Sequence, residues 1–413
     1  MKITHIECSN VKSFKSLSVD LTDFNVIIGM NGAGKSNFIL LFKLIKDILS
    51  TSLQQAITNQ GGTELLRNFY LPSSVNTLKL NYSLQLVSEL KSGKKIGGKD
   101  VVLQIKSINS SLEVTADNAT NNIKLVSDKL ELKFEYFNSN IKLGSSALIA
   151  TRSGNKYQIQ LQNYDSVDYE LREVFGDVTA FNDSEYADSE IILHHLFKEL
   201  FNIDLNNSAA RHISIYEFEQ DLLATIKANS AKNDETESRD LFMDLLHNVL
   251  NDEAKKRSFF NLLNYVLPDI DDVIMEKGSQ NEHRFLVKER FNKRYLPAYL
   301  LSDGTVFLIV IILALYFDNK YLTIFDEPER RIHPHLISKV IDMMKDVSTH
   351  KQIILSTHNS EIVKYSGLDS IVLIKRDEEG HSQLIRPRNS REIATFLDNE
   401  IGLDELFVQN MLS

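Results

Sequence analysis

The sequence feature that most restricts the fold is a segment near residue 30, where an apolar run leads into a glycine-rich turn and then into a helical pattern. Val26, Ile27 and Ile28 are followed by GMNGAGKS and then by NFILLFKLIKDIL. β-Branched residues favour a strand, and the apolar spacing after the turn favours a helix with one buried face. A strand, a glycine-rich loop and a helix in this order predict an α/β fold with a phosphate-binding loop.

The motif GMNGAGKS matches the pattern G-x-x-x-x-G-K-[ST]. Its glycines allow the backbone to curl so that N–H groups point at phosphate oxygens, and the start of the next helix adds the positive end of its dipole. We expect Lys35 to reach the β- and γ-phosphates and the Ser36 hydroxyl to ligate Mg²⁺. The loop residues predicted to bind the nucleotide are Gly29, Asn31, Gly32, Ala33, Gly34, Lys35, Ser36 and Asn37.

A second motif, YLTIFDEPE, is a mostly apolar strand that ends in two adjacent carboxylates. The carboxyl ends of strands are where α/β sheets place ligand groups. Asp326 is predicted to hold Mg²⁺ together with Ser36. Glu327, one residue further along, is predicted to polarise the water that attacks the γ-phosphate.

Two further segments place polar residues at the ends of buried elements. LLSDGTVFLIVIILALYF puts Ser302, Asp303 and Gly304 before a nearly all-apolar helix, and small or polar residues at a helix start favour anion binding. QIILSTHNSEIV is a buried strand whose carboxyl end carries His358. We add these three signature residues to the predicted nucleotide contacts and His358 to the predicted catalytic residues.

Together, GMNGAGKS, LLSDGT, YLTIFDEPE and STHN resemble the ABC-type ATPase heads of the SMC, Rad50 and RecF group. In particular they are similar to the bacterial AAA15/AAA_21-type ATPases, which are related to the ATPase half of OLD-family proteins. The opening ITHIECSNVKSFKSLSVDLTDFNVIIGMNGAGKSN, the element GGTELL and the segment FDEPERRIHPHL carry the same resemblance. It covers residues 1 to about 90 and about 285 to 413.

This resemblance implies a head that dimerises head to tail, with Mg²⁺ and ATP held between the phosphate loop of one subunit and the signature of the other. Ser302, Asp303 and Gly304 would then contact the partner's γ-phosphate, and His358 would be the histidine that senses it. The signature reads LSDGT where transporter heads have LSGGQ, so Asp303 stands in place of a glycine. The motif NKxD, which reads guanine, does not occur in the sequence. GTP is therefore disfavoured.

About 290 residues separate Lys35 from Asp326, so a large insertion interrupts the nucleotide domain. Alternating apolar residues predict antiparallel strands from about residue 77 to 164, and a helical region is predicted from about 166 to 267. The predicted fold class is an α/β P-loop NTPase of ABC/SMC-head type with a mixed β and α-helical insertion. The predicted domains are the head from 1 to 90, the insertion from 91 to 284 and the rest of the head from 285 to 413.

The composition excludes several classes of protein. The 413 residues carry a net charge of −10, and a single cysteine, Cys8, excludes an internal disulfide framework and a cysteine-type zinc site. No run reaches the roughly 18 apolar residues of a membrane span, and MKITHIECSN lacks a signal-peptide core. We therefore expect a cytoplasmic protein without a membrane partner. The basic and aromatic segment 284–295 fits either a nucleic-acid contact or, preferably, a solvated hairpin.

About 55 residues follow His358, too few for the Toprim nuclease domain of OLD proteins, so we expect any nuclease or toxin to be a separate chain. By analogy with the family, the first hypothesis is a sensor or regulatory ATPase subunit of a bacterial anti-phage defence system that works with this effector. The second is a DNA-binding ATPase of RecF type in repair or recombination. The third is an ATP-gated scaffold that sequesters a toxin. The expected assembly is a homodimer or a higher homo-oligomer.

Overall fold

The computed structural model divides into two compact units, and each is described by itself. Unit 1 contains residues 1–22, 29–213 and 374–385, and unit 2 contains residues 23–28, 214–373 and 386–413. The structure describes residues 1–72, 74–86, 91–96, 99–116, 123–138, 141–163, 187, 191–201, 213–217, 226, 237–277, 283–389, 402–409 and 411.

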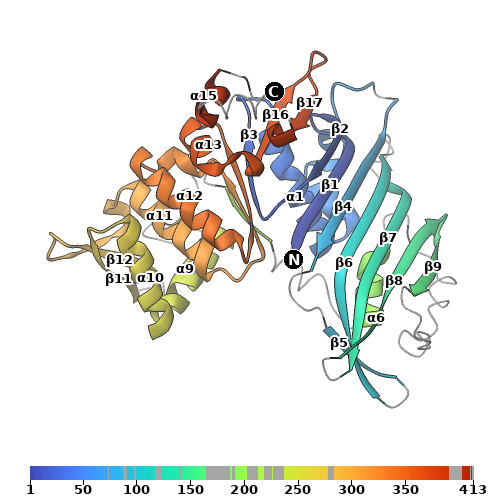
Figure 1. Ribbon diagram of the computed structural model, residues 1–413, viewed down its shortest axis with the longest axis horizontal. Helices are drawn as coiled ribbons and strands as arrows, with labels where there is room; N and C mark the ends of the chain where they lie inside the picture. The colour runs from blue at the N-terminus through green and yellow to red at the C-terminus, as the bar shows by residue number, and fades with distance from the viewer. Residues whose placement is uncertain are drawn as a thin grey trace. The chain divides into compact units, whose positions relative to one another are not determined.

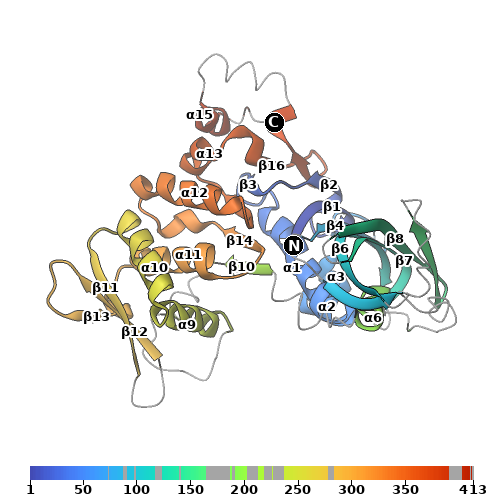
Figure 2. The same cartoon turned by 60° about the horizontal axis from the view of Figure 1, so that its bottom comes forward.

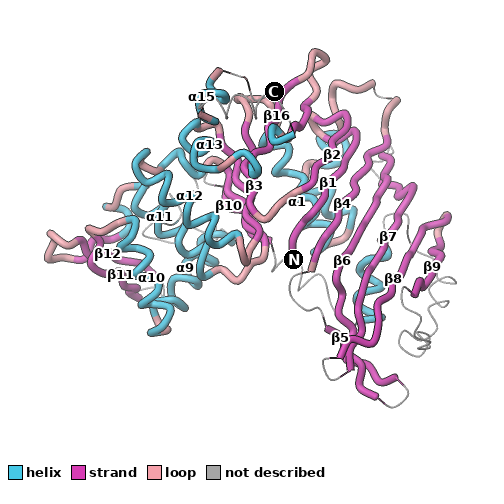
Figure 3. Tube along the Cα trace, in the orientation of Figure 1, coloured by secondary structure: helices cyan, strands magenta, loops and turns pink. Residues whose placement is uncertain are grey.

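Unit 1 is built on a long antiparallel sheet with the strand order β2-β1-β4-β6-β7-β8-β9, in which β5 also pairs with β6 (Figures 1 and 3). Its strands alternate between buried apolar positions and less buried ones, as in β4, where Leu78, Leu80, Tyr82 and Leu84 are buried. The predicted antiparallel strands are therefore present. The strands are β1 (Lys2–Val11), β2 (Phe14–Asp20), β4 (Thr77–Gln85), β5 (Lys91–Ile96), β6 (Lys99–Ala116), β7 (Ile123–Asn138), β8 (Ile141–Ser153) and β9 (Lys156–Asn163).

Helices cover the apolar side of this sheet. Leu44 and Ile48 of α1 line the same small apolar pocket as Leu78 of β4 and Leu112 of β6, so the helix packs against the sheet through its buried face. His194 of α6 hydrogen-bonds through Nε2 to the carbonyl oxygen of Ile48 at 2.8 Å. The helices of unit 1 are α1 (Lys35–Ser50), α2 (Leu53–Asn59), α3 (Gly62–Leu66) and α6 (Ile192–Phe201).

Unit 2 is built on parallel strands. The sheet order is β10-β14-β15-β3-β16-β17, and β14–β15, β15–β3 and β3–β16 are parallel pairs. Strands β3 and β15 are buried at every residue, as expected for a parallel sheet covered on both faces. β16 passes from unit 2 into unit 1, where it pairs with β17 (Ser382–Ile385). The other strands are β3 (Phe24–Ile28), β10 (Ile213–Glu217), β14 (Leu322–Asp326), β15 (Gln352–Thr357) and β16 (Ile371–Arg376).

Helices and a small three-stranded sheet complete unit 2 (Figures 1 and 2). Among the described residues, no helix has both the length and the apolar composition that crossing a bilayer requires. The helices are α9 (Glu237–Leu250), α10 (Glu253–Val266), η2 (Ala298–Leu300), α11 (Asp303–Ile312), η3 (Leu313–Phe317), η4 (Pro328–Arg331), α12 (Pro334–Ser348), α13 (Ser360–Ser366), η5 (Leu368–Ser370), η6 (Pro387–Asn389) and α15 (Leu403–Val408), and the small sheet has β11 (Ile270–Lys277), β12 (His283–Glu289) and β13 (Tyr295–Pro297).

Two details of the insertion and the signature helix differ from the sequence prediction. The region from about 166 to 267 is not all helical, because residues 213–217 form strand β10, which pairs with β14. The alternation ISIY is typical of a strand, but it lies inside a region that the sequence predicts to be helical. The apolar helix predicted after Gly304 also has an irregular end, since α11 gives way to a π-helix over Leu313–Phe317. The Asp318 N–H donates to the carbonyl of Leu313, five residues earlier.

A buried lysine stabilises that irregular end. Lys351 Nζ donates to the carbonyl oxygens of Ala314 at 2.9 Å, Leu315 at 3.1 Å and Asp318 at 2.6 Å. These are carbonyls that the end of a helix leaves without helical partners. Burial lowers the pKa of the Lys351 ammonium from its ordinary 10.5 to about 8.

Replacing Lys351 by Met tests this cap. The variant leaves three buried carbonyls without their donor, so the free energy of unfolding should fall by about 2 kcal/mol or more. Lys345→Met is the matched control, because Lys345 is less buried than Lys351 and donates to the carbonyl of Tyr365; its effect should be below about 1 kcal/mol. Urea unfolding followed by circular dichroism measures both.

The pH dependence gives a second test of the same residue. Between pH 8 and 10.5 the unfolded chain keeps a proton on Lys351 that the folded chain has released. The free energy of unfolding of the parent, relative to that of Lys351→Met, should therefore rise with pH across this window. Equal stability of the two proteins, with no change in their difference from pH 8 to 10.5, would contradict the role of Lys351.

Candidate functional site

The phosphate-loop motif forms the predicted turn between β3 and α1. Gly34 has a φ of 118°, in the left-handed region that suits glycine. A Cβ atom at this position would lie 2.3 Å from the Ser382 hydroxyl oxygen, so a larger residue would not fit. Gly32 has a φ of 77°. Two glycines of the motif are therefore required by the backbone conformation and, at Gly34, by close packing.

The start of α1 has the features of an anion site. Its N-cap, Gly34, provides no side-chain hydrogen bond, and its first turn has no acidic residue. Lys35 is 6% exposed, and its ammonium donates to the carbonyl oxygens of Gly29 at 2.9 Å and Met30 at 3.4 Å. Ser36 is exposed in the first turn. The uncapped N–H groups, the ammonium and the hydroxyl are the donors that a nucleotide's phosphates require.

Residues far away in the sequence support this loop. The Ser382 hydroxyl lies 2.5 Å from the Ala33 carbonyl oxygen and 2.7 Å from the Ser13 hydroxyl oxygen. Asn37, predicted to contact the nucleotide, donates through Nδ2 to Ser13 Oγ at 2.8 Å. Neither serine belongs to a recognisable motif, so the sequence analysis missed both.

The tip of the loop has a separate support. Arg376, at the end of β16, donates through Nε to the Gly32 carbonyl at 3.0 Å and through Nη1 to the Gly380 carbonyl at 2.6 Å. Its guanidinium also lies over the ring of Tyr70, with 5.6 Å between the guanidinium carbon and the ring centroid. The loop that carries Asn31 and Gly32 is thereby attached to the β16–β17 hairpin.

In unit 2, the predicted acidic residues lie at the carboxyl end of β14. Asp326 pairs with Ser356 in the parallel ladder, and the Ser356 hydroxyl donates to Asp326 Oδ1. The N–H of Glu327 donates to the carbonyl oxygen of Ser356 at 3.1 Å. The ends of β14 and β15 are thus joined by their side chains as well as by the ladder.

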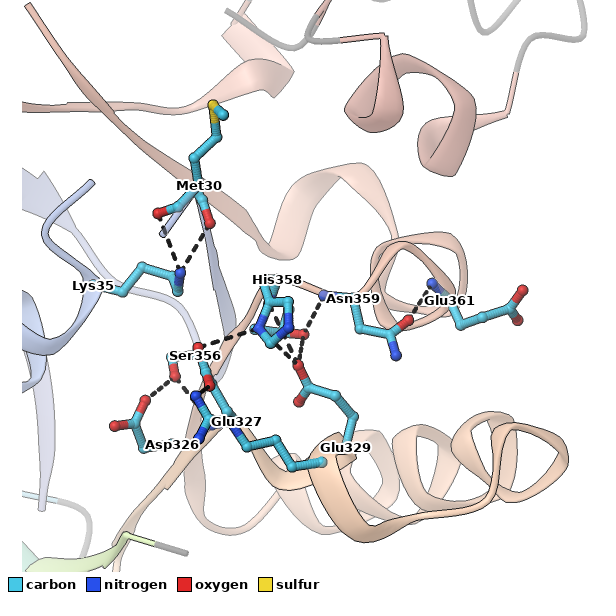
Figure 4. A network of polar contacts seen from close by, with 12 residues as sticks. Met30, Lys35, Asp326, Glu327, Glu329, Ser356, His358, Asn359 and Glu361 are labelled. Carbon is cyan, nitrogen blue, oxygen red and sulfur yellow. Dashed lines mark hydrogen bonds and ion pairs between the residues drawn. The ribbon is translucent and has the colours of Figure 1, made fainter. Parts of the chain in front are cut away.

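Glu327 is held in a conformation that is rare for its residue type. Its φ of 46° and ψ of 56° place it in the left-handed region, which costs an L-residue about 1–2 kcal/mol. Its side chain is 14% exposed, and its Oε1 lies 3.2 Å from His358 Nδ1 (Figure 4). Its Oε2 pairs with Arg330. The structure therefore brings the two predicted catalytic residues, Glu327 and His358, into contact.

A third carboxylate, Glu329, was missed by the sequence analysis. It is buried, and its Oε1 accepts from the Thr357 hydroxyl at 2.5 Å and from the His358 N–H at 3.4 Å (Figure 4). Its Oε2 is buried and has no hydrogen-bond partner. Burial raises the pKa of this carboxyl group above its ordinary value. Glu329 fixes the backbone of the turn that carries His358, and its place in the motif DEPE was the available signal.

The signature residues lie at the start of α11. Ser302 is the N-cap, and its hydroxyl oxygen accepts from the Thr305 N–H at 3.1 Å. Asp303 forms an ion pair with Arg331 of η4. A Cβ atom on Gly304 would lie 2.8 Å from the Arg331 carbonyl oxygen, so only glycine allows this close contact. Ser302 and Asp303 are exposed.

One curated relative is similar to part of this chain. The uncharacterized protein MJECL43 of Methanocaldococcus jannaschii is 24% identical over 149 residues. The match covers 33% of this chain and 39% of the length of that relative.

Solved SMC heads are similar to the chain over most of its length. The SmcHead bound to the C-winged helix domain of ScpA has a TM-score of 0.48 and 15% identity, and the match covers 93% of this chain and 97% of that one. The SMC head domain from Thermotoga maritima has a TM-score of 0.44 and 14% identity, with 94% and 99% covered. An Smc head with an extended coiled coil, bound to the C-terminal domain of ScpA from Pyrococcus furiosus, has a TM-score of 0.46 and 14% identity, with 96% and 99% covered.

The match to a family model covers more of the chain than the match to the curated relative does. Residues 24–364 match the model of the AAA_21 family, described as an AAA domain, putative AbiEii toxin, Type IV TA system. This range contains the phosphate loop, the signature, the DEPE motif and His358. The match and the mixed α/β architecture confirm the predicted α/β fold with an AAA-type ATPase domain. The chain belongs to the AAA_21 family of AAA-domain proteins.

Proposed function

We propose that this protein is an ATPase that binds Mg²⁺·ATP through the phosphate loop and hydrolyses it with Glu327 as the general base. The observation that carries the proposal is the position of Glu327. Its carboxylate follows Asp326 at a strand end, and it contacts His358 at 3.2 Å. A carboxylate that a rare backbone conformation holds beside a histidine is a suitable acceptor for the proton of an attacking water.

The register of the parallel strands supports the same proposal. In unit 2, Asp326 of β14 lies opposite Ser356 of β15, and Thr357 of β15 lies opposite Ile28 of β3. The three strands therefore end at one edge of the sheet. The chain continues from Ile28 directly into Gly29, the first residue of the phosphate loop. Ligands of open α/β sheets bind at such an edge.

Each residue has a role in the proposed reaction. Lys35 and the N–H groups at the start of α1 bind the phosphates. When bound, Mg²⁺ would neutralise charge on the β- and γ-phosphates, and the Ser36 hydroxyl and Asp326 carboxylate are the oxygen donors that would hold it. Water attacks the γ-phosphorus, the bond to the β-phosphate oxygen breaks, and the water proton moves to Glu327. His358 orients the Glu327 carboxylate.

We propose further that two copies assemble head to tail, so that the signature of one copy meets the γ-phosphate bound to the other. The exposure of Ser302 and Asp303 at the start of α11 supports this arrangement, because both side chains are accessible to a second molecule. In this proposal residues 1–90 and 285–413 make up the head and residues 91–284 the insertion.

The physiological proposal is a sensor or regulatory ATPase that works with a separate effector protein in bacterial defence against phage. The description of the family, which refers to a putative toxin and a Type IV TA system, supports a setting of this general type, and the separate effector rests on the sequence resemblance. An alternative, contact with nucleic acid, is favoured by the β12–β13 turn, where Phe291 is 87% exposed among Arg290, Lys293 and Arg294. The alternatives differ in what co-purifies: a protein effector, or nucleic acid that salt releases.

Glu327→Gln tests the proposed chemistry. The amide keeps the size of the side chain but cannot accept the proton, so ATP should remain bound while turnover falls by about 100-fold or more. The dimer should accumulate, because hydrolysis no longer opens it. Steady-state release of phosphate and sedimentation in Mg²⁺·ATP measure the two effects.

The matched control is Glu361→Gln, which makes the same chemical change in the first turn of α13. Because this residue has no role in the proposed reaction, turnover should stay within about twofold of the parent. Unchanged turnover in Glu327→Gln would remove Glu327 as the base and make His358 the next candidate.

Mixing two inactive variants tests the head-to-tail arrangement. Ser302→Arg should block the contact with the partner's γ-phosphate, and Lys35→Ala should prevent ATP binding. A mixed dimer of the two still contains one intact phosphate loop facing one intact signature. ATPase activity should therefore recover in part on mixing, as measured over a range of subunit ratios.

Ser302→Thr is the control for folding in this experiment, because it keeps a hydroxyl that can cap α11. It should retain ATPase activity, whereas Ser302→Arg should not. Full activity of Ser302→Arg as a monomer would contradict the shared site and leave α11 with a packing role only.

A further inference from the structure

Two consecutive arginines in η4 each pair with a carboxylate that the proposed function places near the γ-phosphate. Arg330 pairs with Glu327, and Arg331 pairs with Asp303 of the signature. All four residues lie in unit 2. The arginines were not among the predicted site residues.

Asp303 presents a difficulty for the proposed shared site. Its carboxylate lies in the first turn of α11, beside Ser302, where a partner's phosphate would approach. A carboxylate and a phosphate repel each other, and an unneutralised pair of like charges across an interface costs several kcal/mol. Glycine, which occupies this position in the LSGGQ signature of transporter heads, has no such charge.

Arg331 is held where it can remove this repulsion. Its side chain is only 21% exposed, against 47% for Asp303. Its backbone is packed closely on α11, because a Cβ atom on Gly304 would lie 2.8 Å from the Arg331 carbonyl oxygen. η4 and the start of α11 are therefore in contact through both the ion pair and the backbone.

We propose that Arg331 is a positioning residue that neutralises Asp303 and so makes an acidic signature compatible with the terminal phosphate of a nucleotide bound by a second copy of the chain. The proposal rests on the proposed head-to-tail function. It also implies that η4, which begins directly after Glu327, connects the signature to the proposed catalytic carboxylate.

The experiment measures the concentration of Mg²⁺·AMP-PNP that gives half-maximal dimer in analytical ultracentrifugation. Arg331→Gln removes the positive charge that pairs with Asp303, so this concentration should rise roughly tenfold or more. Asp303→Asn introduced into Arg331→Gln removes the remaining charge and should bring the concentration back to within about threefold of the parent. A purely structural role for the ion pair predicts no such recovery, because the second substitution does not restore the ion pair.

Two further variants control for charge and folding. Arg331→Lys keeps the positive charge and should dimerise nearly as the parent does. Arg330→Gln makes the same change one residue earlier, where the partner is Glu327. If Arg330→Gln weakens dimerisation, adding Asp303→Asn to that variant should therefore not restore it. Thermal melting of every variant shows whether it is folded.

The outcomes separate this inference from the proposed function. If the parent protein does not dimerise with Mg²⁺·AMP-PNP, both the head-to-tail function and the role of Arg331 are overturned. If the parent dimerises but folded Arg331→Gln does so equally well, or if Asp303→Asn fails to restore it, only the role of Arg331 is overturned. If Arg331→Gln does not fold while the double variant folds and dimerises normally, the neutralising role stands, since removal of both charges is then tolerated.

Discussion

The parallel pairing of β14, β15 and β3 is the constraint on which the rest of the candidate site depends. Because the register places Asp326 opposite Ser356 and Thr357 opposite Ile28, the three strands end at the same level. Glu327, Glu329 and His358 follow shortly after the ends of β14 and β15. A shift of one residue in any strand would turn its side chains to the opposite face of the sheet.

The polar residues at this edge lower the stability of the fold. Glu327 has a left-handed backbone conformation, and Glu329 is buried with one carboxylate oxygen lacking a partner. Each of these two features reduces the free energy of unfolding, compared with an ordinary turn that makes apolar contacts. The Thr357 hydroxyl and the His358 N–H compensate in part by binding the other oxygen of Glu329. Strained and incompletely satisfied groups cluster where chemistry requires a fixed geometry, which agrees with the proposed reaction.

Sequence reasoning identified the parts of the site that depend on local patterns. The turn at Gly34, the burial of Lys35 and the contact between Glu327 and His358 all lie in motifs that can be read directly. The role of each predicted residue in binding or catalysis stays a prediction.

The contacts that support these motifs could not be read in the same way. Ser13 and Ser382 support the phosphate loop from positions hundreds of residues apart in the chain, and the ion pair of Asp303 with Arg331 joins two motifs that looked independent. Such contacts depend on how β17 and η4 pack, which no local spacing specifies. The strand β10 was missed for a simpler reason: its five residues lie in a region read for helical spacing.

The most direct test of the central claim is calorimetric titration of the protein with Mg²⁺·ATP and, separately, with AMP. If the uncapped start of α1 and Lys35 bind a chain of phosphates, Mg²⁺·ATP should bind with one site per subunit, and AMP, which lacks the β- and γ-phosphates, should bind about 100-fold more weakly or not at all. Equal affinities for Mg²⁺·ATP and AMP, or no binding of Mg²⁺·ATP by the folded protein, would contradict the account.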